Sequence, residues 1–210
     1  VAIGRAFVYI PAELNIPART ARTLDEEMRP FDMARQRARL ELQGLYEAIE
    51  KRAGKEEASI FEAHQEMLSD PAFEGKIREF VEIGLTVEQA LVRATEELAS
   101  LLAGMEDELF AARALDVKDV GRRVLRILLG LPDTTLSAVT EPSIIIAEDL
   151  TPSDTASLDP ELTLGFITVQ GGLTSHSAIL ARTLGLPAIV GMGGDLLQKV
   201  SNGTFIVMDG

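Results

Sequence analysis

The chain has 210 residues, of which 46% are hydrophobic and 25% charged, enough for one large domain or two small ones with cores of their own. It has no cysteine, which excludes disulfides and thiolate metal sites and favours a cytoplasmic location, and it has no apolar run of the ~20 residues that a membrane span requires. A net charge of −13 argues against a nucleic-acid partner and favours a basic protein partner.

The first 131 residues predict one strand followed by a run of helices. Residues 1–9 form a strand-like apolar run, and Pro11 and Pro17 predict a loop that reaches Arg22. Capping boxes, a first-turn proline and helical periodicity then predict five helices. These are expected over 23–51 and 56–69, from Pro71 onward, over 86–112, and over 116–130.

Beyond Pro132 the pattern changes to short apolar strands that alternate with short helices. The strands are expected at 143–147, 164–169, 188–190 and 204–208. The strands need the first strand of the chain to complete their sheet. We therefore predict an α/β domain formed by residues 1–22 and 132–210, with a helical subdomain inserted at 23–131.

One histidine follows the strand at 164–169 and begins a helix. Residues 171–172 are glycines that allow a tight turn, and Thr174 or Ser175 can cap the helix. His176 therefore lies in the first turn, where free N–H groups and the helix dipole favour a neutral imidazole and a bound anion. A neutral imidazole is a nucleophile, and the same N–H groups and hydroxyls would hold the phosphoryl group that it accepts.

Other readings of these residues are weaker or more ordinary. A lone histidine in a first helical turn is commonly a capping or surface residue, and Ser175 and His176 point apart, so they form no nucleophile–base pair. His64 lies on an apolar helical stripe and is predicted to be packed and hydrogen-bonded. Residues 191–195 lack the third glycine of a dinucleotide loop and are predicted to form a turn.

The string GGLTSHSAILAR, followed by LGLPAIVG, is similar to the phosphohistidine signature of Enzyme I of the bacterial phosphoenolpyruvate-dependent sugar phosphotransferase system. Pyruvate phosphate dikinase and phosphoenolpyruvate synthase carry a similar string. Residues 60–70, 116–123 and 148–155 also resemble the amino-terminal half of Enzyme I, in the same order. The resemblance covers essentially the whole chain.

The resemblance implies a fold of the α/β class, a phosphohistidine (swivelling) β/α domain with an inserted all-α helical subdomain. It implies a phosphotransferase in which His176 carries phosphate on its tele nitrogen, from phosphoenolpyruvate to the phosphocarrier HPr, for sugar uptake. Thr155 matches the threonine that contacts the active histidine, and Arg182 matches the signature's arginine, which would balance the phosphate. With Thr174 and Ser175, these residues make up the predicted catalytic site.

The resemblance also implies that the helical subdomain docks HPr. Carried over by position, the apolar and polar contact residues are Met67, Phe73, Leu102, Glu56, Asp70 and Arg113. Three apolar positions on three helices are equally compatible with a core. Residues 53–112 hold fourteen acidic and four basic side chains, which either form an ordinary solvated face or steer a basic partner.

Enzyme I continues into a barrel domain that binds phosphoenolpyruvate and magnesium. We therefore expect no cofactor in this part, magnesium in that further domain, and partners that are HPr and the phosphoenolpyruvate domain, with no nucleic acid and no membrane. Two alternatives remain open. The chain is an Enzyme I-like domain of a multidomain phosphotransferase, such as a dihydroxyacetone-kinase subunit or a fructose-system fusion, or it is a binding module that is never phosphorylated.

Overall fold

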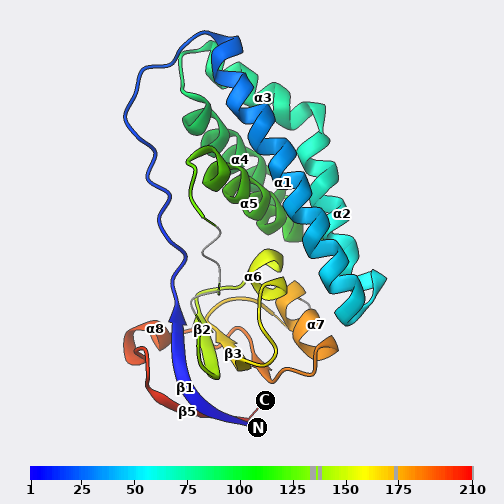
Figure 1. Ribbon diagram of the computed structural model, residues 1–210, viewed down its shortest axis with the longest axis vertical. Coiled ribbons are helices and arrows are strands. Elements are labelled where there is room, and N and C mark those ends of the chain that lie inside the picture. Colours follow the sequence, from blue (N-terminus) through cyan, green and yellow to red (C-terminus); the bar gives the residue numbers. More distant parts are fainter. Residues whose placement is uncertain (133–135, 137–138, 173–174, 210) are drawn as a thin grey trace. The chain divides into compact units, whose positions relative to one another are not determined.

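A computed structural model describes residues 1–132, 136, 139–172 and 175–209 (Figure 1). Its contacts divide the chain into an α/β unit of residues 1–12, 48–57 and 134–210 and a helical unit of residues 13–47 and 58–133. The predicted α/β fold with an inserted helical part is confirmed. The contact-based boundaries differ from the predicted ranges, because residues 13–22 join the helical unit and residues 48–57 join the α/β unit.

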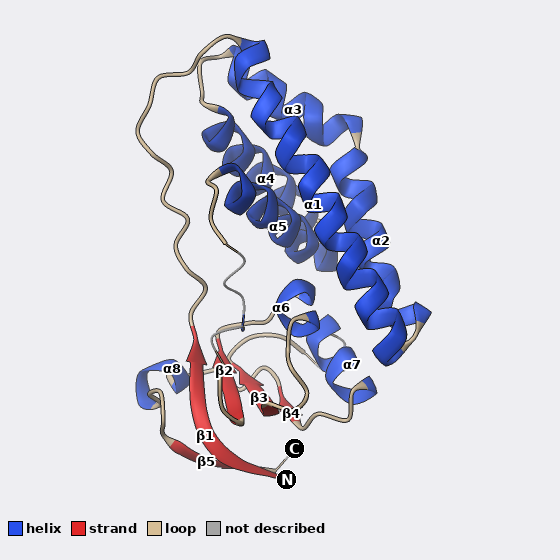
Figure 2. Cartoon of the chain, in the orientation of Figure 1, coloured by secondary structure: helices blue, strands red, loops and turns tan. Residues whose placement is uncertain are grey.

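Five helices precede the second strand of the chain, and most of their residues form the helical unit (Figure 2). Their start signals act as the sequence predicts. Asp70 caps the third helix by accepting a hydrogen bond from the Ala72 N–H at 2.8 Å, and Thr86 and Gln89 form a reciprocal capping box. The helices are α1 (Leu24–Ala53), α2 (Lys55–Ser69), α3 (Pro71–Glu82), α4 (Val87–Ala103) and α5 (Glu108–Leu128).

Two predicted helix boundaries are wrong. The helix expected over 86–112 ends at Ala103, and the next begins at Glu108 rather than at Asp116. Gly104 caps α4 through its N–H, which bonds to the Ser100 carbonyl at 3.1 Å. Because apolar residues recur at helical spacing on both sides of this break, periodicity alone does not locate it.

Helices α4 and α5 pack closely. A Cβ atom on Gly121 of α5 would lie 2.6 Å from Cγ2 of Thr95 on α4, closer than real atoms approach. The absence of a side chain at Gly121 is therefore what allows this helix spacing. Fully buried residues from three helices fill the core of the same unit, among them Phe31, Leu91 and Val124.

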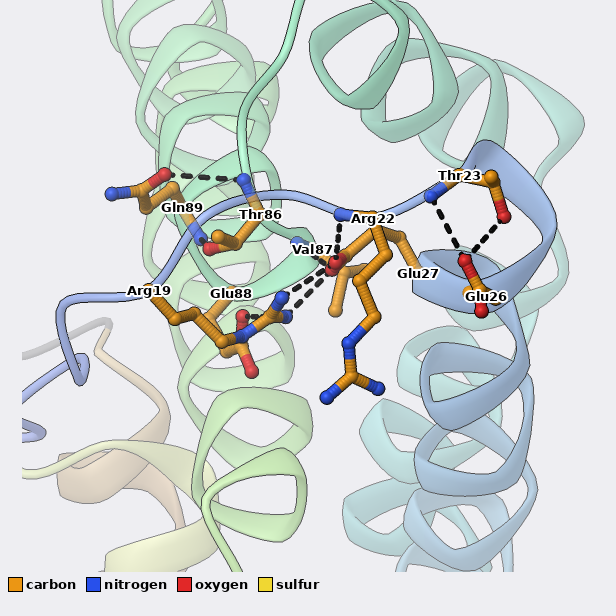
Figure 3. Close-up of polar contacts among 9 residues, drawn as sticks. All are labelled: Arg19, Arg22, Thr23, Glu26, Glu27, Thr86, Val87, Glu88 and Gln89. Carbon is orange, nitrogen blue, oxygen red and sulfur yellow. Dashed lines mark hydrogen bonds and ion pairs between the residues drawn. The ribbon is translucent and has the colours of Figure 1, made fainter.

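An ion-pair network fixes the segment that leads into α1 to the start of α4 (Figure 3). Arg19 donates to Glu27 at 2.5 Å and to Glu88 at 2.6 Å. The Glu27 carboxylate, whose side chain is 1% exposed, also accepts the backbone N–H groups of Arg22 and Val87, both at 2.9 Å. One carboxylate thus holds together three segments of the helical unit.

The sheet of the α/β unit has the order β4-β3-β2-β1-β5. Neighbouring strands from β4 to β1 run parallel, whereas β5 pairs with β1 in the antiparallel sense (Figure 2). All residues of β2 are buried, as expected for a central strand that is covered on both faces. The strands are β1 (Ala2–Tyr9), β2 (Ser143–Ala147), β3 (Thr163–Thr168), β4 (Ala188–Ile189) and β5 (Phe205–Met208).

Three short helices complete the unit: α6 (Pro152–Ala156), α7 (His176–Thr183) and α8 (Leu196–Lys199). The carboxyl ends of β2 and β3 lie side by side, because Ala147 pairs with Thr168. The segments that follow these two strands lead into α6 and α7. In parallel sheets this edge is where sites are usually built, and three of the residues predicted to be catalytic, Thr155, Ser175 and His176, lie in the segments that follow it.

Candidate functional site

His176 is the first residue of α7 and is partly exposed. Ser175 precedes it as the N-cap, and its hydroxyl accepts a hydrogen bond from the Ala178 N–H at 3.3 Å. The Ser175 N–H bonds in turn to the Gly172 carbonyl at 2.9 Å. The imidazole is therefore at the positive end of the helix dipole, where a phosphoryl group is favoured and a cationic ring is opposed.

Glycines allow a second segment to lie against the loop that precedes α7. The N–H groups of Gly191, Met192 and Gly193 donate to the carbonyls of Gln170, Thr168 and Val169, respectively, at 2.9–3.1 Å. A Cβ atom on Gly191 would lie 2.6 Å from the Gly171 carbonyl oxygen. The residues predicted as a turn therefore support the loop that leads into α7, and a side chain at position 191 would displace this loop.

Thr155 lies in α6, which packs against α7. Its side chain is fully buried, and its hydroxyl donates to the Thr151 carbonyl at 2.9 Å, which leaves the oxygen able to accept. Asp154 anchors the same helix, since its carboxylate accepts the Tyr9 hydroxyl at 2.7 Å from β1. The structure brings the helices of Thr155 and His176 together, and a contact between the two side chains stays a prediction.

Residues 48–57, where α1 ends and α2 begins, hold α6 and α7 within the α/β unit. Arg52 donates to the carbonyls of Ala156 and Leu158 at 3.3 and 3.1 Å, so it satisfies oxygens at the end of α6. The Thr183 hydroxyl, at the end of α7, donates to Glu57 at 2.9 Å. Sequence reasoning missed both contacts, because each joins residues more than a hundred positions apart.

Asp149 is a further residue at this edge that sequence reasoning did not assign. Its carboxylate is half-buried and accepts the Leu150 N–H at 2.8 Å. Burial raises the pKa of this carboxyl, and the nearby charge of Glu148 adds to the effect. Its position directly after a buried parallel strand is the sequence signal that would have pointed to it.

Oxygen atoms from three segments converge on Gly171. A Cβ atom placed there would lie 3.6 Å from Oδ1 of Asp149, and 3.7 Å from both the Ser175 and the Thr168 hydroxyl oxygens. Gly171 has a φ of +94°, in the region that favours glycine. Gly171, in the loop that leads into α7, is thus surrounded by a carboxylate and two hydroxyls.

Arg182, also predicted to be catalytic, does not join this group. Arg182 is exposed in the last turn of α7, about 9 Å further along the helix axis than His176. Its predicted role in balancing the phosphate stays a prediction. Thr174 lies outside the described residues.

Five of the six residues predicted to bind the partner lie in the helical unit. Met67, Asp70 and Phe73 line a shallow depression there, and Leu102 packs with Met67 against a small apolar cluster on α4 and α5. Phe73 is only 6% exposed, so it belongs to the core as much as to the surface.

The other two residues predicted to bind the partner, Arg113 and Glu56, are both exposed. Arg113 pairs with Asp116 at 3.2 Å in the helical unit. Glu56 belongs to the α/β unit. The predicted docking set is therefore divided between the two units.

His64 is fully buried and packs edge-on against Phe61, so the predicted packing is confirmed. The predicted hydrogen bonds are wrong, since among the described residues neither ring nitrogen has a hydrogen-bond partner. The nearest carboxylates belong to Asp116, 3.4 Å from Nε2, and Asp119, 3.9 Å from Nδ1. This histidine is therefore closed off from any phosphate donor.

The described residues contain no group of three or more His, Asp or Glu side chains placed to hold a metal ion. Within the same part of the chain, no helix has the length and apolarity that crossing a bilayer requires.

Two family descriptions match the chain. "PEP-utilising enzyme, N-terminal" matches residues 1–113, and "PEP-utilising enzyme, mobile domain" matches residues 139–210. The second range contains His176 and Asp149. The first range contains β1, the helices from α1 to α4 and the start of α5.

Similar proteins carry a shared name. The phosphoenolpyruvate-protein phosphotransferase of Haloferax volcanii is 44% identical over 180 residues, which cover 86% of this chain and 32% of that protein. The protein of that name in Listeria innocua is 36% identical over 211 residues, covering 100% of this chain and 37% of its own length. The chain thus spans about a third of the length of the curated relatives that it matches.

A solved structure supports the fold. A solution structure of an Enzyme I protein superposes with a TM-score of 0.72 at 38% identity. The match covers 97% of this chain and 83% of that one.

Proposed function

This chain belongs to the family of phosphoenolpyruvate-utilising enzymes, and on that premise we propose that it carries a phosphoryl group on His176 and exchanges it with the phosphocarrier HPr. The observation that carries the proposal is the place of His176, first in α7 behind a serine N-cap, at the carboxyl edge of a parallel sheet. The names of the relatives support the same reaction class.

In the proposed step, the lone pair of Nε2, the tele nitrogen of His176, attacks the phosphorus of the carrier's phosphohistidine. A P–N bond forms on His176 while the P–N bond of the carrier breaks, and its electron pair returns to the carrier's imidazole. That ring takes up the proton that the His176 ring gives up. Because the bond formed and the bond broken are of one kind, the transfer is reversible.

The environment of His176 supports this chemistry. The helix dipole of α7 opposes protonation of the ring and so keeps it nucleophilic, and it favours the dianionic group once that is bound. The Ser175 hydroxyl lies at the N-cap of α7, next to the turn that carries His176, and it can donate to a phosphate oxygen. We place Thr155 behind the ring as the residue that fixes its orientation.

For the partner, we propose that HPr docks on the helical unit over the depression that Met67, Asp70 and Phe73 line. Leu102 and Arg113 lie on α4 and α5, two helices that also line this depression, whereas Glu56, predicted with them, belongs to the α/β unit. The residues that support this assignment are those that the Enzyme I resemblance matches by position.

We assign phosphoenolpyruvate and magnesium to another domain of the longer relatives, so this chain would act as the acceptor and donor in the middle of the transfer sequence. The described residues offer no acidic cluster for the metal. The cytoplasmic location predicted from the sequence stays a prediction.

Incubation with phospho-HPr tests the proposal. We expect an acid-labile label that peptide mass spectrometry places on His176, and we expect His176→Ala to lose the label and keep its melting temperature, because a partly exposed first-turn side chain adds little packing. Phosphoenolpyruvate with magnesium should give no label with this chain alone. An undiminished label in His176→Ala, or a label on His64, would contradict the assignment.

The same assay separates the alternatives. A chain that binds HPr and is never labelled would be a binding module. A labelled chain fits both an Enzyme I and an Enzyme I-like domain of a multidomain phosphotransferase, and those two differ in the domains that accompany this one.

A further inference from the structure

The proposed transfer leaves one charged group at the site without a role. Asp149 extends from the carboxyl end of β2 toward the loop before α7, and its Oδ1 atom and the Ser175 hydroxyl both lie within 3.7 Å of one point, the Cβ position at Gly171. Ser175 is bonded to His176 in sequence and caps its helix. Oδ1 of Asp149 and the Ser175 hydroxyl oxygen are therefore at most about 7 Å apart, which brings the carboxylate near the residue that precedes His176.

In the part of the chain that the structure describes, no cation pairs with this carboxylate. Among the described residues, the groups that act on it are the Leu150 N–H, which donates at 2.8 Å, and the negatively charged Glu148. A carboxylate near a phosphoryl group raises the free energy of that group, because like charges repel. The half-buried position of Asp149 strengthens this repulsion, since it reduces screening by water.

We propose that Asp149 adjusts the equilibrium of phosphoryl transfer. Its negative charge near the start of α7 destabilises the phosphoryl group on His176 and so favours its return to the carrier. The inference rests on the proposed function. It gives the site two opposed influences, since the dipole of α7 favours the bound phosphate and Asp149 opposes it. A site with the first influence alone would hold the phosphoryl group too tightly to be an intermediate carrier.

The equilibrium constant for phosphoryl exchange with phospho-HPr measures this effect. Asp149→Asn removes the charge and keeps a carbonyl oxygen for the Leu150 N–H, so the loop is expected to stay in place. We expect the equilibrium to shift toward the phosphorylated chain by roughly five- to tenfold, and phosphoryl return to free HPr to slow. Asp149→Ser is a second neutral variant for which the same direction is expected.

Glu148→Gln is the matched control, because it removes the same charge from the adjacent, exposed position and keeps an acceptor for Gln170, which Glu148 holds at 2.7 Å. It should leave the equilibrium within about twofold of the unmodified chain, since exposed charges are screened. The fraction of phosphorylated chain can be read directly from ³¹P NMR of the mixtures.

An unchanged or lowered equilibrium constant in both neutral variants would overturn the inference, and so would an equal shift in Glu148→Gln. Loss of the native melting transition in both variants would mean that Asp149 is structural, which overturns it as well. The failure of the proposed function looks different, because the unmodified chain would then take no label from phospho-HPr at all.

Discussion

At the scale of single residues, Glu27 combines burial with a full set of donors (Figure 3). The hydrogen bonds from Arg19, and then those from the Arg22 and Val87 N–H groups, lower the pKa of its carboxyl to about 2 against the opposing effect of burial. The hydrogen bonds that Arg19 donates to Glu27 and Glu88 raise its own pKa. The ionised pair is therefore the stable form of this network at neutral pH.

We predict that Arg19→Gln destabilises the helical unit by about 1–3 kcal/mol at pH 7, because it leaves a buried carboxylate short of its charged donor. Urea unfolding monitored by circular dichroism measures the loss. Arg39→Gln is the control, since Arg39 is exposed on the same α1 and forms no ion pair among the described residues. An equal loss in both variants would show that the network adds nothing.

The pH dependence of that difference follows from the direction of the Glu27 shift. A carboxyl whose folded-state pKa is lowered contributes stability that is fully present above its unfolded value, 4.5, and is lost as the pH falls toward about 2. The gap between the unmodified chain and Arg19→Gln should therefore be constant at neutral pH and narrow below pH 4.5. A gap that stays constant in acid would contradict the assignment to Glu27.

How far single residues could be predicted depends on the range of their contacts. The start of α7 can be predicted because its signals, two glycines, a serine cap and a histidine, lie within six residues of the chain. Arg19 and Glu88 are 69 positions apart, and Asp149 meets Gly171 only after two strands have paired. No local pattern reports such pairs, since tertiary contacts decide them.

At the scale of helices, α2 and α3 each contribute an apolar residue to the predicted docking surface, and the two differ in burial. Met67 is partly exposed, whereas Phe73 is 6% exposed. We predict that Met67→Ala lowers HPr affinity by about 1–2 kcal/mol and changes the melting temperature little. Phe73→Ala should instead destabilise the unit by about 3 kcal/mol or more, as a core truncation does.

Calorimetric titration with HPr, together with thermal melts of both variants, distinguishes these outcomes. The two variants serve as controls for each other, because both shorten an apolar side chain at the same depression. A Met67→Ala variant with full affinity and a lowered melting temperature would mean that this surface is core and that HPr docks elsewhere.

The helices also show which boundaries a sequence can locate. Asp70-Pro71 and Thr86 combine a capping side chain with a strong first-turn preference, and both mark real helix starts. The end of α4 was missed because Gly104 is a single weak signal inside a continuing apolar pattern. Helix starts are easier to predict than helix ends here, because the starts have side-chain caps, whereas α4 ends at a glycine that bonds through its backbone N–H.

At the scale of the whole molecule, part of the acidic excess of residues 53–112 lies on the surface. Three of the four basic side chains there, Lys76, Arg78 and Arg93, already pair with neighbouring glutamates. Glu62 and Glu82, among other acidic side chains, remain on the surface. This leaves a negative field that is suited to attracting a basic protein.

We predict that the association rate with HPr falls several-fold as ionic strength rises to physiological values, where charges more than about 8 Å apart are largely screened. The dissociation rate should change less, since short-range packing at the interface controls it. Stopped-flow measurements across a salt series give both rates. If the association rate does not depend on salt, the acidic face does not attract HPr and contributes only to solubility.

The insertion of the helical unit also sets the order in which the chain folds. β1 is synthesised before the other strands of its sheet, and both of its partners, β2 and β5, come from the last third of this sequence. Until Ser143–Ala147 has been made, β1 has no partner strand in this sheet, while the helices between them can form on local contacts. Helices that fold first also shorten the flexible loop that must close before β1 and β2 pair, which lowers its entropic cost. The strand of this sheet that is made first is thus among the last to acquire its hydrogen bonds.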